Sequence, residues 1–202
     1  DVHPDLASSD IIDLFLVEQR LYVLLNGGSG FDGGAFLVFD TSQILADGLD
    51  AKTLERIDFP GLTLTDSHLF GGRLYIAFDG ADSGITTLTF NGEGISSSAN
   101  YPVEGKITYL ADNGDRLAYA RVFDDKYFVG LLEYGLDGSY LEKQVGGVDV
   151  LGNAGQHFWF FTGEESKFVV EKLTGEQRFV GTFSTFDETR TLISGLNDSE
   201  SS

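Results

Sequence analysis

The 202-residue chain carries 32 acidic and 13 basic residues, which gives a formal net charge of −19 and a pI of about 4.2. Hydrophobic residues make up 42% of the chain and aromatic residues 13%, enough for an apolar core, so global disorder is excluded. A surface of this charge repels phosphate groups and no basic patch offsets it, so nucleic acid and anionic membranes are excluded as partners.

Cysteine and methionine are both absent. Without cysteine the chain has no disulfides, no thiolate nucleophile and no thiolate zinc site. No stretch approaches the roughly 18 consecutive apolar residues of a membrane-spanning helix. Because the first residue is Asp1 rather than methionine, we expect a processed chain that has lost a signal peptide and is secreted, periplasmic or on the cell surface.

Four segments of the chain share one plan. Each has an apolar opening stretch, a turn, a stretch that begins on a basic or polar residue and continues with aromatic side chains, a Gly/Asp loop and a third alternating stretch. The second stretches begin at Arg20, Arg73, Arg116 and Gln156, which are 53, 43 and 40 residues apart. The third and fourth stretches cover residues 35–40 and 54–57, 85–90 and 101–103, 128–134 and 140–143, and 168–173 and 178–183. This pattern predicts four short antiparallel strands in each repeat.

The repeats cover residues of about 8–57, 58–105, 106–145 and 146–186. One short helix is predicted from Ser42, within residues 42–54, and this insertion explains why the first spacing is the longest. Residues 189–193 have the pattern of a further opening strand, and the remaining residues are polar. We expect residues 1–186 to form a single domain and residues 187–202 to form an extra strand and a flexible tail.

The period and the strand count resemble those of β-propeller repeat proteins in general. Residues 131–138, Leu-Leu-Glu-Tyr-Gly-Leu-Asp-Gly, look like the third strand and turn of many extracytoplasmic propellers. No Trp-Asp dipeptide closes a strand, and neither a kelch double glycine nor a cysteine pair is present, so no subfamily is indicated. The resemblance implies an all-β array of four-stranded antiparallel blades, either four-bladed or part of a larger propeller. A β-sandwich is the alternative fold.

Acidic residues fall between the second and third strands of each repeat, in loops that share one face of a propeller. We therefore expect an acidic face formed by Asp32, Asp79, Asp82, Asp124, Asp125, Glu164 and Glu165. Flexible, oxygen-rich loops suit calcium, although none has the spacing of a known calcium loop. A basic partner is a second interpretation, and solvated turns that merely favour Asp and Gly are a third.

Aromatic side chains concentrate in residues 158–161, Phe-Trp-Phe-Phe. Aromatic residues at a channel mouth stack on sugar rings, whereas aromatic residues between blades only fill space. Trp159 is retained as a candidate binding residue because tryptophan is rarely fully buried.

Catalytic patterns are weak in this sequence. Four aspartates lie in the predicted opening strands or their turns and are candidate channel carboxylates: Asp13, Asp66, Asp112 and Asp149. The three histidines lack the spacing of a metal site, and the Gly-rich segment 27–30 matches neither a phosphate loop nor a nucleophile elbow.

The sequence therefore favours a non-catalytic, extracytoplasmic scaffold that presents an acidic loop face to a protein or glycan partner. One alternative is a hydrolase or lyase that acts on a polysaccharide with channel carboxylates. Another is a structural subunit of a filament or complex that self-associates through open blade edges.

Overall fold

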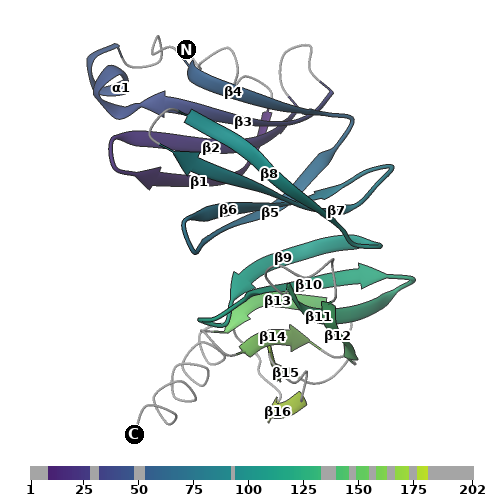
Figure 1. Cartoon of the computed structure of the whole chain (residues 1–202). Helices are drawn as coiled ribbons and strands as arrows, with labels where there is room; N and C mark the ends of the chain where they lie inside the picture. The colour runs from purple at the N-terminus through teal and green to yellow at the C-terminus, as the bar shows by residue number, and fades with distance from the viewer. Residues whose placement is uncertain are drawn as a thin grey trace, which may run out of the picture. The chain divides into compact units, whose positions relative to one another are not determined.

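A computed structural model describes residues 9–27, 32–47, 53–91, 94–132, 140–145, 149–154, 158–162, 167–172 and 177–181. These residues form sixteen strands and one helix (Figure 1). The strands make four antiparallel sheets of four strands each, so the predicted all-β, four-stranded architecture is confirmed. By its internal contacts the chain divides into two compact units, residues 1–103 (unit 1) and 104–202 (unit 2). The single domain expected over residues 1–186 stays a prediction.

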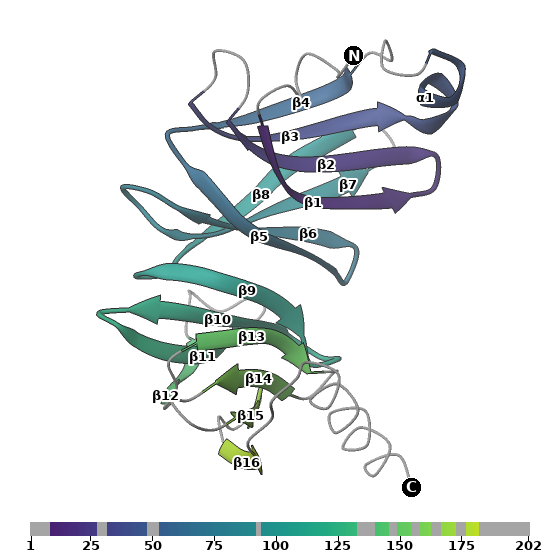
Figure 2. The ribbon, with the colours of Figure 1, turned by 180° about the vertical axis from the view of Figure 1, so that it is seen from behind.

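Unit 1 contains the first two sheets. Sheet 1 consists of β1 (Ser9–Val17), β2 (Arg20–Gly27), β3 (Gly33–Asp40) and β4 (Thr53–Pro60), with helix α1 (Thr41–Asp47) between the last two strands. Sheet 2 consists of β5 (Thr63–Phe70), β6 (Arg73–Asp79), β7 (Gly84–Asn91) and β8 (Gly94–Pro102). Seen from behind, the strands of each sheet follow one another in chain order (Figure 2).

Unit 2 repeats the arrangement. Sheet 3 consists of β9 (Lys106–Asp112), β10 (Leu117–Phe123), β11 (Lys126–Leu132) and β12 (Tyr140–Val145). Sheet 4 consists of β13 (Asp149–Ala154), β14 (Phe158–Thr162), β15 (Lys167–Glu171) and β16 (Gln177–Gly181). The further strand and tail predicted for residues 187–202 lie outside the described residues.

The strands agree with the alternating pattern, and their ends show where the pattern is silent. The helix starts at Thr41, one residue before the predicted start, and Ser42 N donates to Asp40 Oδ1 at 2.8 Å. Strand β8 begins at Gly94, well before the predicted stretch at 101–103. Its first half is rich in serine, which has a weak strand preference, and it is held by the ladder with β7.

A β-bulge recurs in the first strand of every sheet. Between the paired positions of the first and second strands, the first strand carries one extra residue. The extra residues are Ile12, Thr65, Thr108 and Leu151, opposite the equivalent point of the second strand each time. A bulge bends its strand and increases the twist, so all four sheets carry the same local distortion.

The core of unit 1 lies between its two sheets. Tyr22, Leu24 and Phe36 of sheet 1 are buried in one cluster with Leu74 and Ile76 of sheet 2. The ring of Tyr22 stacks on that of Phe36, with 5.7 Å between the centroids. Such aromatic pairs stabilise a core by about 1 kcal/mol beyond the area they bury.

A side-chain amide joins the same two sheets at one end. Asn26, near the end of β2, accepts a hydrogen bond from Leu64 N at 2.8 Å and donates to Leu64 O at 2.7 Å. Leu64 precedes the bulge in β5. The amide therefore pairs with a strand residue as a backbone would, and it fixes the end of β2 against the end of β6, because Leu64 pairs with Phe78.

The core of unit 2 lies between sheets 3 and 4. Ala118, Ala120 and Leu131 of sheet 3 cluster with Trp159 and Val170 of sheet 4, and all five side chains are buried. Small alanines on β10 leave room for the large indole. In the described residues, no helix is long and apolar enough to cross a membrane.

Candidate functional site

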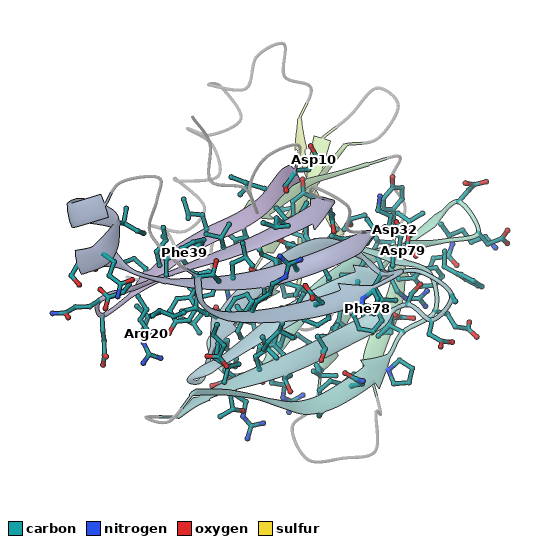
Figure 3. All side chains as sticks on the ribbon, turned by 90° about the horizontal axis from the view of Figure 1, so that it is seen from above. Asp10, Arg20, Asp32, Phe39, Phe78 and Asp79 are labelled. Atoms are coloured by element: carbon teal, nitrogen blue, oxygen red, sulfur yellow. The ribbon has the colours of Figure 1, made fainter. Side chains whose placement is uncertain are left out.

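Three of the predicted acidic residues meet at one end of unit 1. Asp32 and Asp82 are exposed, while Asp79 is half-buried and accepts a hydrogen bond from Ser83 Oγ at 3.0 Å. Asp32 precedes β3, and the other two belong to the turn between β6 and β7, so the Asn26 clamp holds these loops together. Figure 3 shows Asp32 and Asp79 side by side, with Asp10 toward the same end. We call Asp32, Asp79 and Asp82 the acidic end of unit 1.

The positive charges of the same unit lie elsewhere. Arg20 and Arg73 are the first residues of β2 and β6, whereas the acidic end follows the last residues of those strands. The two groups are therefore a strand length apart, about 20 Å at roughly 3.4 Å per residue. Figure 3 shows Arg20 at the end opposite Asp32 and Asp79. The third described arginine, Arg56, already pairs with Asp58 at 2.7 Å. Opposite charges are thus separated along the sheets.

The acidic pair of unit 2 has a structural explanation. Asp124 and Asp125 are the two residues between paired Phe123 and Lys126, and their φ angles are 52° and 55°. Positive φ at both central residues is the geometry of a type I′ hairpin turn, which Asp tolerates better than most residues. Lys126 Nζ lies 4.0 Å from Asp124 Oδ2, and both side chains are largely exposed. The turn alone accounts for these two acids.

The acidic face across all repeats stays a prediction. Glu164 and Glu165 lie outside the described residues, and Asp124 and Asp125 belong to the other unit. The part of the chain that the structure describes holds no group of three His, Cys, Asp or Glu residues that could bind a metal ion. Calcium binding therefore stays an expectation from composition.

Trp159 is in the core, so its prediction as a binding residue is wrong. Its side chain is 0% exposed and packs among the alanines of β10. The alternative interpretation, that aromatic residues fill space between sheets, is the correct one for this residue. Alternating apolar residues on both sides of β14 produce such burial on whichever face meets a neighbouring sheet.

A buried lysine beside Trp159 escaped the sequence analysis. Lys172 is 2% exposed, its Nζ lies 4.9 Å from the centroid of the Trp159 ring, and it donates to Asp112 O at 2.8 Å. Burial lowers the pKa of Lys172 from 10.5 to about 8, against the smaller raising effect of the Asp112 charge. Its place in an otherwise apolar stretch, residues 168–173, was the available signal.

We expect Lys172 to make stability depend on alkaline pH. Below pH 8 the amine is charged in both the folded and the unfolded chain, but between pH 8 and 10.5 the unfolded chain binds more protons, so stability rises with pH. Lys172→Met removes this rise, and the advantage of Lys172→Met over wild type should fall by about 2 kcal/mol across that interval. Urea unfolding at several pH values measures it. Lys106→Met, an exposed position, is the control and should show no such trend.

The candidate channel carboxylates have structural partners. Asp13 follows the bulge in β1; its Oδ2 lies 2.5 Å from Ser67 Oγ of β5, and its Oδ1 accepts from Leu14 N at 2.7 Å. Asp112 Oδ1 accepts from Gly114 N at 2.8 Å within a turn. The side chain of Asp149 lies outside the described residues. Asp66 follows the equivalent bulge in β5, so the repeated bulge places an aspartate at the same point in both sheets of unit 1.

A second network, in unit 2, also had no sequence signal. Arg121 of β10 and Glu142 of β12 form a two-fold ion pair, with Nε–Oε1 and Nη2–Oε2 distances of 2.6 Å. Arg121 Nη1 donates to Glu104 O, and its guanidinium lies 4.4 Å from the centroid of Phe128. Tyr119 Oη donates to Glu142 Oε1 at 2.9 Å. The ion pair raises the pKa of Arg121 further above its usual value.

Solved structures match this arrangement of sheets. A candidate 6-phosphogluconolactonase from Bacteroides uniformis aligns with a TM-score of 0.56 and 8% identity, over 86% of this chain and 54% of that chain. The complex of the fission yeast SREBP–SCAP binding domains aligns with a TM-score of 0.53 and 11% identity, over 87% and 49%. Hsv2 from Kluyveromyces lactis aligns with a TM-score of 0.53 and 12% identity, over 85% and 52%. The sheets have the fold of β-propeller blades.

At these identities the likeness concerns the fold alone, and the chain spans about half the length of the structures it matches. No family model matches the sequence, and a search of curated proteins finds no relative. The comparisons include both a WD40 domain that takes part in protein binding and a candidate enzyme. The function of this chain must therefore be argued from its own residues.

Proposed function

We propose that the protein is an extracytoplasmic binding scaffold whose acidic end in unit 1 receives a basic segment of a partner protein. The observation that carries the proposal is the separation of charge along the sheets. Asp32, Asp79 and Asp82 meet at one end with no basic partner among the described residues, while Arg20 and Arg73 start the same strands at the other.

Such an arrangement favours association more than folding. Like charges gathered at one end repel each other, and that repulsion is relieved when a cationic segment binds. The overall charge of −19 adds a long-range attraction for basic partners, which speeds their encounter. A protein partner is favoured over a glycan because the aromatic residue kept for sugar stacking, Trp159, is buried. The SCAP domain among the matched structures provides a precedent for protein binding by this fold.

The proposal is tested with a fluorescent octalysine peptide as the probe, at 50 mM and 300 mM salt. Neutralising the acidic end with Asp32→Asn, Asp79→Asn and Asp82→Asn should raise the dissociation constant at least tenfold at low salt. The control variant removes the same number of charges elsewhere, with Glu18→Gln, Glu104→Gln and Asp115→Asn at exposed positions.

The control should raise the dissociation constant by no more than threefold. Binding of wild type should weaken steeply between the two salt concentrations, because screening over about 8 to 10 Å removes the attraction. Equal losses in both variants would show that only bulk charge matters and would overturn the proposal.

A further inference from the structure

Sheet 1 has a second apolar face, which we call the outer face. It consists of Ile11, Leu14 and Leu16 on β1 together with their cross-strand partners on β2. The register pairs Ile11 with Leu25, Leu14 with Val23 and Leu16 with Leu21. Directly paired residues of an antiparallel ladder point to the same side of the sheet, so these six side chains share one face.

The bulge at Ile12 makes this row continuous. In a regular strand, residues three apart point to opposite sides, and Ile11 would face away from Leu14. The extra residue shifts the register by one, so Ile11 and Leu14 lie on the same side. The opposite side of β1 contributes Phe15 to the cluster shared with sheet 2. Sheet 1 is therefore apolar on both faces, which is typical of a sheet with a neighbour on each side.

The β1 row is open to solvent. Ile11, Leu14 and Leu16 are 57%, 55% and 62% exposed, the three highest values among the described large hydrophobic residues. Leu25 and Val23 beside them are buried. Helix α1 reaches the face through Ile44, which packs near Phe39 at the far edge. An exposed apolar row along the first strand of a blade-like sheet marks a surface that takes up a partner.

We propose that the outer face of sheet 1 docks a second copy of this chain. The matched propeller structures are about twice as long as the portion this chain covers, with coverage of 54%, 49% and 52% of their lengths. Two copies of this chain supply as much chain as one such structure. A β-propeller has no free blade face, and each of its blades is covered by the next. A second copy provides the sheet that the outer face lacks.

The charges on this face are compatible with self-association. The row on β1 and its partners on β2 carry no charge, and the next polar residues on that side of the sheet, Arg56 and Asp58 of β4, neutralise each other at 2.7 Å. The acidic end lies at the ends of the strands rather than on this face (Figure 3). Two chains of −19 still repel at long range, so self-association should strengthen as salt rises, the opposite of the salt trend expected for the basic peptide.

Sedimentation equilibrium of the full chain, at 50 mM and 500 mM salt and over a hundredfold range of concentration, tests this proposal. Wild type should reach twice the monomer mass of 22.0 kDa at high salt. Leu16→Asp should raise the dimer dissociation constant at least tenfold. Leu69→Asp is the matched control, since Leu69 is 43% exposed on β5 and lies off the outer face, and it should dimerise as wild type does.

Circular dichroism melts establish that both variants remain folded. Leu14→Asp provides a second test of the same row if Leu16→Asp fails to fold. A wild-type mass that stays at the monomer value under all conditions would overturn the proposal, and so would equal weakening by Leu69→Asp. Octalysine binding separates this proposal from the proposed function, because Leu16→Asp should leave peptide binding unchanged.

Discussion

Glu142→Gln is expected to lower the free energy of unfolding of unit 2 by about 3 kcal/mol. The Arg121 side chain is only 9% exposed and its charge is balanced by Glu142 alone among the described carboxylates. Neutralising the partner leaves a charged guanidinium buried without compensation, and that cost exceeds the small net benefit of forming the pair. The Tyr119 hydrogen bond is weakened as well. Urea unfolding followed by Trp159 fluorescence measures the effect, because Trp159 is the sole tryptophan and lies in the core of unit 2.

Two comparisons make this result specific. Asp124→Asn disrupts an ion pair in the same sheet whose side chains are 54% and 80% exposed, and it should cost less than about 0.5 kcal/mol. The double variant Arg121→Met, Glu142→Leu removes both charges and should recover most of the loss. A Glu142→Gln cost as small as that of Asp124→Asn would contradict the role assigned to the pair.

Gly130→Ala is expected to destabilise unit 2 by about 3 kcal/mol, because the new methyl group has no space. A Cβ at this position would lie 2.3 Å from Cζ and 2.4 Å from Oη of Tyr119. Gly130 pairs with Tyr119 on one side and with Glu142 on the other. The glycine therefore lets the Tyr119 ring cross β11, so that its hydroxyl reaches Glu142 at 2.9 Å.

A double-mutant cycle separates this clash from other costs of replacing the glycine. In a Tyr119→Leu background the hydroxyl and ring are gone, and Gly130→Ala should then cost less than about 1 kcal/mol. The same unfolding measurement gives both values. If Gly130→Ala costs as much without the tyrosine ring as with it, the ring is not the reason for glycine at this position.

The parts of the fold that follow from local pattern could be predicted. Apolar alternation located β2 and β6, and turn residues located the ends of β10 and β11. The meeting of Asp32 with Asp79 also followed from the repeat, because equivalent loops of antiparallel sheets fall at the same end.

Features that depend on distant partners or single-residue insertions could not be predicted. Lys172 and Asp112 are 60 residues apart, and Arg121 and Glu142 are separated by 21 residues and an intervening strand. The bulge at Ile12 adds one residue and leaves no mark in composition, yet it decides which face Ile11 joins. The aromatic stretch at 158–161 carried no information on which side chain would meet a neighbouring sheet, so Trp159 was placed wrongly.

Amide chemical-shift mapping tests most directly whether the acidic end of unit 1 is the binding surface. The ¹⁵N-labelled full chain is titrated with octalysine at 50 mM salt. The largest shifts should fall at Asp32, at Asp79 and Asp82 and at the neighbouring Asn26, and they should saturate together with one dissociation constant. Shifts centred on the opposite end, near Arg20 and Arg73, or spread evenly over the acidic residues of the chain, would contradict the proposed function.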